Sequence, residues 1–510
     1  MRKLVHGAAP LTAPLLAAAL VAALPAPAAA VPDPAGTVGI EDIRRHLEAF
    51  QEIAAYNGGD RAAGRPGYDV SVKYVVSQLK RAGFTPRVQP FQFDYWEERT
   101  PAAFARTAPA PPATYRPGTD FQTMRYSGTG DVTAAAAAVD VPAAGAGTAG
   151  CEAADFAGFP AGSVALIQRG TCSFETKAAN AQAARAAAVV IYNLPGEPGQ
   201  VNGTLGRPFT IPAVETPHAL GAELVRAARA GGLRLRIRTD TAAGKRSASN
   251  VIADTVHGRD DNVVVVGAHL DSVREGPGIN DNGSGAATIL AVAQWIQRPG
   301  RQAPRNKVRF AWWGAEEEGL VGSEHYVASL SAADRAKLAL NLNFDMLGSP
   351  NGIRGVYDGD GSLGTGTTPP AGSGAIEKIF KDHYAARGLP TLESEFNGRS
   401  DYGPFIEHGI PAGGLFSGAE VVKTPRQAAL FGGTAGRPYD PCYHKACDTT
   451  ANIDWRLLDT HAGGVAAATW RLAASTLPVN GEARRAVRPG AALPRAAVPA
   501  AEWRGGHRVR

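Results

Sequence analysis

The chain has 510 residues, of which 44% are hydrophobic and 19% are charged. This composition is sufficient for two or three domains with a large apolar core, and it excludes a wholly disordered chain. The formal net charge is +5, but residues 481–510 alone carry seven Arg and two Glu. The rest of the chain therefore has no positive excess, and we expect no nucleic-acid partner.

The first thirty residues have the order of a secretory signal peptide. Arg2 and Lys3 precede an apolar stretch that ends at Leu24, and three alanines at 28–30 follow it. The apolar stretch is shorter than the roughly 20 residues that a membrane span needs, and no later segment is a better candidate. We therefore expect a secreted protein without a membrane span from which residues 1–30 are removed; an uncleaved anchor is the alternative.

The four cysteines are expected to form disulfides in an exported protein. Cys151 and Cys172 lie in one region, and Cys442 and Cys447 lie in another. We expect each pair to be joined locally. Four cysteines allow three connectivities, however, and the sequence does not choose between them.

Helical periodicity dominates residues 40–83, with a Gly-rich interruption near Asn57 and a glycine at 83 that is expected to end the second helix. Phe91, Phe93 and Tyr95 then alternate with polar residues, which predicts a strand. Residues 100–117 are rich in Pro and Ala, and we interpret them as a linker.

Residues 118–240 have the pattern of a smaller α/β unit, which we interpret as an inserted domain. Its predicted strands are 164–167, 189–192 and 233–237. The last of these alternates aliphatic residues with arginines, so its charged side is expected to face solvent. Ser173, Lys177 and His218 have no motif around them, and we expect them to be surface residues.

From Ser249 onward, apolar runs alternate with helical stretches. This pattern is typical of a mainly parallel sheet with helices on both faces, and we predict a mixed α/β fold. The clearest strands are 263–266, 308–312 and 340–344. The catalytic domain is expected to be discontinuous and to comprise 38–105 and 241–477. After it the chain becomes rich in Ala, Pro and Arg, and we expect 478–510 to be a disordered or removable tail.

Each of these three strands leads directly into side chains that can bind metals. His269 and Asp271 follow the first strand, Glu316 and Glu317 follow the second, and Asp345 follows the third. Ligands bind beyond the carboxyl ends of parallel strands, so we expect these groups to share one crevice.

Two loops add further candidates. Asp281 lies in the Gly-rich turn 278–285 before an apolar helix, where the helix N-terminus favours its negative charge. It is therefore well placed to bridge two cations. Tyr443 and His444 lie between two cysteines, and a disulfide there would stiffen the loop that presents them.

A mixed set of imidazoles and carboxylates suits a pair of divalent cations, and zinc fits it best. The expected metal ligands are His269, Asp281, Glu317, Asp345 and His444. Two such ions hold a hydroxide and polarise a carbonyl, which is hydrolytic chemistry. Glu316 is the expected general base, and Asp271 is expected to fix the tautomer of the His269 imidazole.

These segments closely resemble secreted bacterial di-zinc aminopeptidases of the leucyl-aminopeptidase type. The segments are 267–272, 280–285, 313–317, 343–346, 439–448, 398–405 and 413–420. The match spans about 40–100 and 245–475. Residues 118–240, in particular 164–170 and 172–193, resemble a protease-associated domain.

The resemblance implies that His269 and Asp345 bind one zinc ion, that Glu317 and His444 bind the other, and that Asp281 bridges them. It also implies that Glu316 activates the bridging water. Tyr443 is then the phenol that steadies the tetrahedral oxyanion.

The resemblance also implies features around these ligands. The peptide bond between Asp281 and Asn282 is expected to be cis. The substrate amine is expected to be recognised by acidic groups of the site and by the backbone near Arg399. Met346 and Phe416 are the expected walls of a pocket for large apolar N-terminal residues. Some members of the family bind calcium, but no cluster in this sequence indicates it.

The predicted function is therefore an exported, monomeric zinc aminopeptidase that acts on the N-termini of peptides or proteins. A carboxypeptidase or dipeptidase on the same scaffold is the nearest alternative. A receptor-like ectodomain that keeps the fold without the chemistry is a second alternative from a different class, and a di-metal phosphoesterase is a third.

Overall fold

The computed structural model describes residues 38–140, 148–197, 199–201 and 203–481. The predicted signal peptide and most of the predicted tail lie outside this part of the chain. The first residues of the expected tail belong to helix α12 (Leu477–Asn480). Within the described ranges, none of the helices combines the length and the apolarity that a membrane crossing requires.

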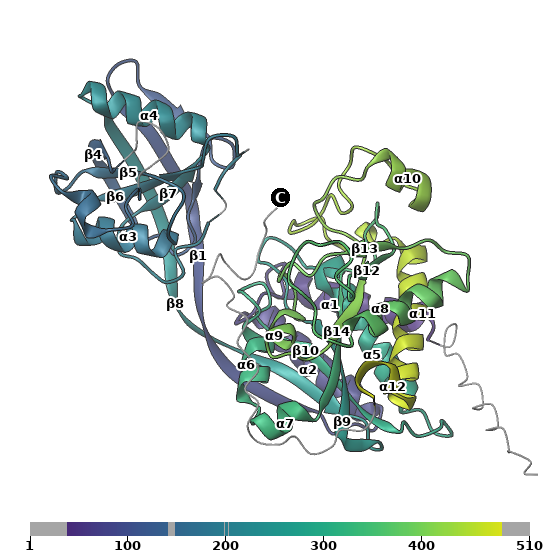
Figure 1. Cartoon of the computed structure of the whole chain (residues 1–510). Helices are drawn as coiled ribbons and strands as arrows, with labels where there is room; N and C mark the ends of the chain where they lie inside the picture. Colours follow the sequence, from purple (N-terminus) through teal and green to yellow (C-terminus); the bar gives the residue numbers. More distant parts are fainter. Residues whose placement is uncertain (1–37, 141–147, 198, 202, 482–510) are drawn as a thin grey trace, which may run out of the picture. The chain divides into compact units, whose positions relative to one another are not determined.

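The main body, residues 38–99 and 241–481, is built on a mixed sheet (Figure 1). Its hydrogen-bonded order is β13-β12-β14-β11-β9-β10-β8. The strands are β8 (Arg234–Asp254), β9 (Arg259–His269), β10 (Asn306–Trp313), β11 (Leu338–Asp345), β12 (Gly355–Tyr357), β13 (Leu392–Ser394) and β14 (Ala412–Phe416). The central strands β10, β9, β11 and β14 are parallel, whereas β8 runs antiparallel to β10 and β12 runs antiparallel to β14. Strand β13 is parallel to β12. Strands β9 and β11 are apolar runs buried along almost their whole length, as expected when both faces of a parallel sheet are covered.

Helices cover both faces of this sheet, which confirms the predicted fold class. One face packs against α1 (Ile40–Tyr56), α2 (Pro66–Arg81), α5 (Gly285–Ile296), α8 (Ser373–Ala385) and α11 (Trp455–Ala474). The other packs against α6 (Val321–Ser329) and α9 (Gly403–Glu407). Two short helices, α7 (Ala332–Ala336) and α10 (Pro425–Phe431), lie in connections.

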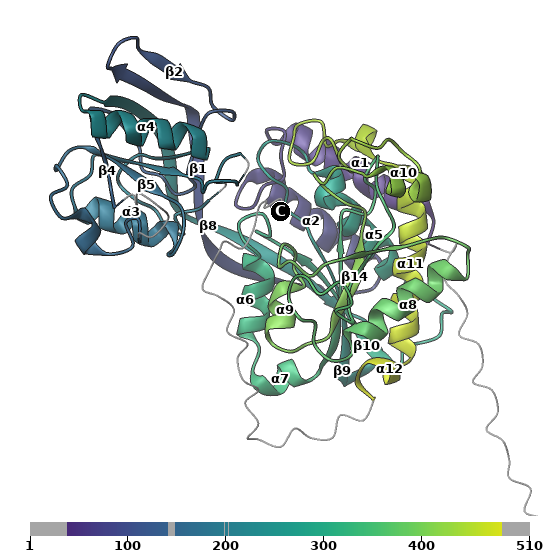
Figure 2. The ribbon, with the colours of Figure 1, turned by 45° about the horizontal axis from the view of Figure 1, so that its top comes forward.

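The insert, residues 100–240, is a second α/β unit. Its strands are β2 (Ala113–Tyr115), β3 (Gln122–Thr123), β4 (Gly130–Ala138), β5 (Val164–Gln168), β6 (Ala188–Tyr192) and β7 (Ala213–Thr216). Helices α3 (Phe174–Ala183) and α4 (His218–Ala230) each pack on a separate apolar cluster, and Figure 2 shows them on opposite faces of the insert sheet. The three strands predicted in this unit are present.

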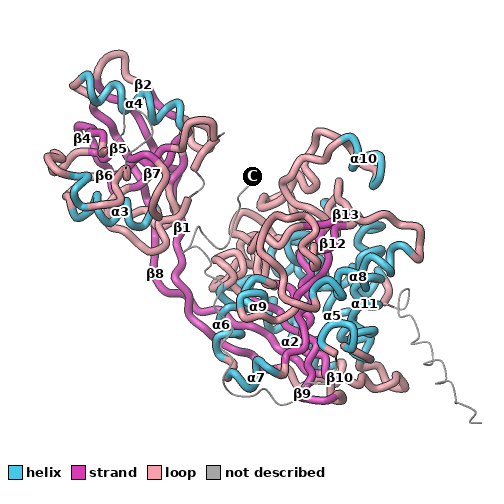
Figure 3. The backbone as a smooth tube through the Cα atoms, in the orientation of Figure 1, coloured by secondary structure: helices cyan, strands magenta, loops and turns pink. Residues whose placement is uncertain are grey.

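Two long strands connect the insert to the main body. β1 (Arg87–Ala108) pairs antiparallel with β8 from Arg87↔Ile252 to Ala108↔Arg234, and Figure 3 shows both as continuous strands. The interpretation of residues 100–117 as a linker was therefore wrong. The pairing is irregular between Thr100 and Ala103. Such an irregularity accommodates Pro101, which cannot donate to the ladder.

A second expectation fails inside the insert. Lys177 was predicted to lie on the surface, but its side chain is fully buried. Its ammonium donates to the carbonyl of Ala149 at 2.6 Å and lies 3.6 Å from Cys151 Sγ. Cys151 forms a disulfide with Cys172, and Cys442 with Cys447, so the local pairing of cysteines is present.

Candidate metal centre

The parallel register brings three strand ends to one edge of the sheet. His269, the last residue of β9, is paired with Trp313 at the end of β10, and Asp345 ends β11. Glu316 and Glu317 follow β10 within four residues. The predicted convergence of these side chains is what the structure shows.

Asp281 comes from a tight turn between β9 and α5. The turn spans Ile279–Ser284, and the peptide bond between Asp281 and Asn282 is cis, as the resemblance implied. The Asp448 carboxylate accepts hydrogen bonds from the backbone N–H groups of Asn280 (2.8 Å) and Asp281 (3.0 Å). The turn is thereby fixed to the loop that carries His444.

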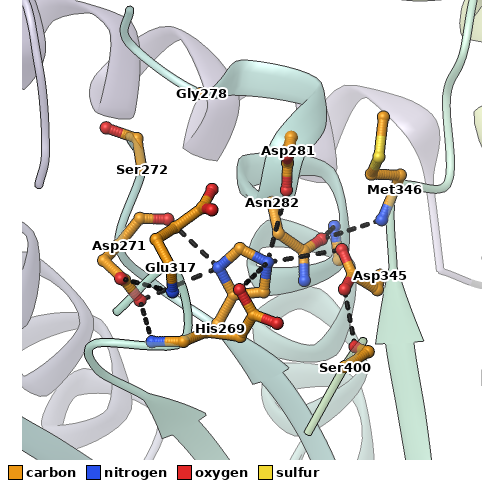
Figure 4. A network of polar contacts seen from close by, with 12 residues as sticks. His269, Asp271, Ser272, Gly278, Asp281, Asn282, Glu317, Asp345, Met346 and Ser400 are labelled. Atoms are coloured by element: carbon orange, nitrogen blue, oxygen red, sulfur yellow. Dashed lines mark hydrogen bonds and ion pairs between the residues drawn. The ribbon is translucent and has the colours of Figure 1, made fainter. Parts of the chain in front are cut away.

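Asp281 lies between two histidines that come from distant parts of the chain. Its Oδ1 is 3.3 Å from His269 Nε2, and its Oδ2 is 2.9 Å from His444 Nε2. His269 Nε2 also lies 3.3 Å from Asp345 Oδ1, and His444 Nε2 lies 3.2 Å from Glu317 Oε2. Figure 4 shows the His269 ring between Asp271 on one side and Asp345 on the other. Two three-residue groups thus share Asp281.

The hydrogen-bonding capacity of these groups indicates bound cations. His269 Nδ1 faces the backbone carbonyl of Asp271 at 3.2 Å, and a carbonyl only accepts, so Nδ1 carries a proton. The lone pair on Nε2 of a neutral ring then faces the carboxylate oxygens of Asp281 and Asp345, which also only accept. Buried acceptors that face one another need a positive charge between them, and either a proton on the ring or a metal ion provides it.

The pKa values of the two histidines also indicate that positive charge is favoured at the site. Burial lowers the pKa of His269, but Asp345 and Glu316 raise it well above its ordinary value. Burial also lowers the pKa of His444, while Glu317 and Asp281 raise it to about 10. The carboxylates around both imidazoles therefore favour positive charge at these positions, whether it is a proton or a metal ion.

Glu316 lies beside the ligands without duplicating the position of Glu317. It is 5% exposed, and its Oε2 is 3.9 Å from His269 Nε2. The Asp271 carboxylate accepts the backbone N–H groups of both Glu316 (3.2 Å) and Glu317 (3.3 Å). Asp271 thus positions two residues in addition to the His269 ring. Burial, together with Glu317, raises the pKa of Glu316 well above its usual range, although His269 opposes the shift.

Tyr443 is held beside the centre by a basic residue. Arg399 donates to the Tyr443 hydroxyl at 3.3 Å and to Glu420 Oε1 at 2.8 Å. Burial, reinforced by Asp281, raises the pKa of Tyr443 well above its ordinary value. The phenol therefore keeps its proton and can donate a hydrogen bond.

Some residues that support the centre were not predicted from the sequence. The buried Arg61 donates to the carbonyls of Pro277 (2.8 Å), Gly278 (2.6 Å) and Leu270, and so holds together the segments that carry His269 and Asp281. No spacing pattern connects Arg61 to partners more than 200 positions away. Asp448, by contrast, ends the 439–448 segment, and its acidic side chain beside the cysteine loop was a usable signal.

Asp345 is oriented from a different loop. Asn343 donates to Ser400 Oγ at 2.7 Å, and Ser400 Oγ donates to Asp345 Oδ2 at 2.6 Å. Asp345 Oδ1 is buried without a hydrogen-bond donor among the described residues. One oxygen is thus anchored and the other is left for a metal ion.

The centre opens into a cavity of about 330 Å³. Met346 and Phe416, the predicted pocket walls, both line it, as does Arg399. Ile353, Tyr357 and Leu392 extend the apolar lining. The cavity therefore joins the polar centre to a space that suits an apolar side chain.

Comparisons with known proteins agree with this geometry. The sequence profile of peptidase family M28 matches residues 250–469, and that of the PA domain matches residues 129–224. An aminopeptidase of Pseudomonas aeruginosa is 46% identical over 449 residues, which cover 86% of this chain and 82% of the relative. A probable leucine aminopeptidase 2 of Aspergillus fumigatus is 39% identical over 445 residues, which cover 86% and 84%. The solved aminopeptidase of Aneurinibacillus sp. strain AM-1 has a TM-score of 0.66 at 27% identity, over 86% of this chain and 94% of that one.

Proposed function

This chain belongs to peptidase family M28 and is a hydrolase of the aminopeptidase class, and we propose that it is exported and uses two zinc ions to remove single N-terminal residues from peptides. The observation that carries the proposal is the position of Asp281, whose two oxygens each face a different imidazole. A carboxylate in this position serves two metal ions better than one.

The donors divide into two sets around Asp281. His269 and Asp345 would hold one ion, and Glu317 and His444 would hold the other. Nitrogen and oxygen donors of this kind suit zinc. When bound, the two ions supply Lewis-acid polarisation of the scissile carbonyl and lower the pKa of water.

Glu316 acts as the general base in this proposal. It takes a proton from the attacking water and returns it to the leaving amine, a role that suits a buried carboxylate with a raised pKa. Asp271 restrains it through the backbone hydrogen bond to Glu316. The side chain is thereby kept at the centre while its neighbour binds metal.

Tyr443 donates its phenolic hydrogen to the oxyanion that develops on the scissile carbonyl. Arg399 holds the hydroxyl in position. The N-terminal side chain enters the apolar part of the cavity between Met346 and Phe416, which favours large apolar residues. Both disulfides support export, because such bonds persist in oxidising compartments.

Hydrolysis of a leucyl arylamide by the purified protein tests the proposal. We expect turnover that is lost on chelation and restored by zinc, and a test peptide that shortens from its N-terminus by mass spectrometry. Shortening from the C-terminus, or no turnover with zinc bound, would contradict it.

The number of ions is tested separately by metal analysis. We expect two zinc ions per chain in the wild type and fewer than one in Asp281→Asn. Asp261→Asn is the matched control, because Asp261 is exposed and pairs with Arg259 far from the centre. One ion per wild-type chain would overturn the two-metal part.

A further inference from the structure

One wall of the substrate cavity carries a carboxylate that the proposed mechanism does not use. Strand β13 and the residues after it contribute Leu392, Glu393, Ser394 and Glu395 to the lining. Glu395 is half-buried. Glu395 lies in the cavity but far from the metal ligands in the sequence. It could therefore bind a group of the substrate.

The other carboxylates of the lining all have partners. Asp281, Glu316, Glu317 and Asp345 belong to the metal centre. Glu393 pairs with Lys381 and accepts from Ser362 at 3.2 Å, and Glu420 pairs with Arg399 at 2.8 Å. Glu395 has no hydrogen bond or ion pair with any residue that the structure describes. It is therefore available to a ligand in the cavity.

The surroundings of Glu395 favour a cation over an anion. Lys381 pairs with both Glu377 and Glu393. Ser362, which bonds Glu393, also lies 3.3 Å from Asp358 Oδ1. Carboxylates therefore outnumber the ammonium of Lys381 in the residues around Glu393. Arg399, the cation of the cavity lining, is paired with Glu420, so the summed potential attracts positive charge.

Apolar side chains line part of the same cavity. Leu392, Tyr357 and Phe416 provide it, and the Tyr357 and Phe416 rings are parallel with centroids 6.5 Å apart. A flat apolar wall next to a carboxylate matches a side chain with a long methylene stem and a charged end. Lysine and arginine have this form.

We propose that the cavity accepts N-terminal lysine and arginine as well as large apolar residues, and that Glu395 is the carboxylate that pairs with their side-chain cation. The inference rests on the proposed aminopeptidase function and specifies its substrate class. Glu395 acts in selectivity and takes no part in the chemical step.

Lysyl and norleucyl arylamides provide the matched probes, because norleucine has a linear aliphatic side chain but no charge. The quantity to measure is the ratio of kcat/KM for the lysyl substrate to that for the norleucyl substrate. We expect a ratio near or above one in the zinc-loaded wild type and a ratio about two- to fivefold lower in Glu395→Gln, as for a partly exposed ion pair. Because both substrates are tested on each preparation, partial misfolding changes both rates and leaves the ratio unaffected.

Glu48→Gln is the control for a general change in charge, since Glu48 is exposed on α1 outside the cavity; its ratio should equal that of the wild type. An unchanged ratio in Glu395→Gln, or a wild type that cleaves the norleucyl substrate more than a hundredfold better, would overturn the assignment. Failure to cleave either substrate would instead contradict the proposed function.

Discussion

The main body and the insert both bury charged groups, but they do so in different ways. In the insert, the Lys177 ammonium points at carbonyl oxygens, with the Ala149 oxygen at 2.6 Å. In the main body, His269, Asp281 and Asp345 direct acceptor atoms at one another over 3.3 Å. The first arrangement is complete by itself, whereas the second needs a cation.

This difference separates a structural polar core from a functional one. Burying a charge is costly unless its partners are present. The insert meets that cost with its own backbone. At the metal centre, the main body leaves that cost to be met by a ligand. The buried charges of this centre are therefore expected to control activity, while Lys177 of the insert is expected to control only stability.

The largest expected effect follows from removing the general base. In Glu316→Gln we expect kcat on a leucyl arylamide to fall by roughly 10²–10⁴, the usual contribution of a positioned base, while zinc content stays at the wild-type level. Steady-state kinetics and metal analysis measure the two quantities. Lys177→Met, a change of buried charge in the insert, is the control and should keep the wild-type kcat. If Glu316→Gln kept more than a tenth of the wild-type kcat, the buried charges of the main body would not control activity as proposed.

Loss of the phenolic donor should have the next largest effect. Tyr443→Phe removes one hydrogen bond to the oxyanion and keeps the ring, so we expect kcat to fall by about 10² with little change in KM. A rise in KM with kcat unchanged would place Tyr443 in ground-state binding instead. Phe431→Leu on the exposed helix α10 provides a control outside the centre.

The main body also contains a buried histidine, His461, whose Nε2 has no hydrogen-bond partner among the described residues. His461 Nδ1 donates to the Leu347 carbonyl at 2.8 Å, and burial lowers the pKa of His461 to about 4. The unfolded chain takes up this proton near pH 6.5, before the folded chain does. The free energy of unfolding should therefore fall as pH drops from 6.5 to 4, by up to about 3 kcal/mol.

His461→Asn keeps a donor near Nδ1 and cannot titrate, so it should lose this part of the pH dependence. Denaturant unfolding monitored by tryptophan fluorescence measures it. His257→Asn, at an exposed position, should behave as the wild type. Parallel curves for the wild type and His461→Asn would show that the ring is not buried as neutral imidazole.

The smallest expected effect lies in the insert. Burial lowers the pKa of Lys177 to about 8, with Asp155 opposing the shift. Between pH 8 and 10.5 the unfolded chain holds this proton and the folded chain has released it. The contribution of Lys177 to the free energy of unfolding should therefore rise with pH over this window, by no more than about 3 kcal/mol, which does not exceed the effect expected for His461. Lys177→Met should abolish this slope in thermal unfolding scans; a slope that persists would assign it to other groups.

The sequence was most informative where a single requirement, such as burial on both faces of a strand, applied to every residue of a continuous segment. The run 263–266 consists of four valines, and 340–344 places Leu340, Leu342 and Phe344 around two asparagines. Short apolar segments of this kind are typical of strands whose two faces are covered, and metal-binding side chains follow both directly. Asp281 and His444 were recognisable because a Gly-rich turn and a cysteine loop mark them. The roles assigned to the site residues remain predictions that the variants above test.

The sequence was least informative where partners are distant or belong to the backbone. The acceptor of Lys177 is a carbonyl 28 positions away, and carbonyls leave no signature in a sequence. Residues 100–108 form a strand despite their Ala and Pro content, because the ladder with β8 outweighs intrinsic preference. The contacts of Arg61 depend on the assembled fold in the same way.

The long pair β1–β8 has a consequence for the modular construction of the enzyme. The chain leaves the main body and returns to it at directly paired positions, such as Trp96↔Ala243 and Tyr95↔Gly244, whose Cα atoms in an antiparallel ladder are only about 4.5–5.5 Å apart. A two-residue turn spans that gap. The segment between these paired positions could therefore be removed, and the two strands could be joined by a hairpin turn without interrupting the catalytic domain. Another domain could be inserted at the same place.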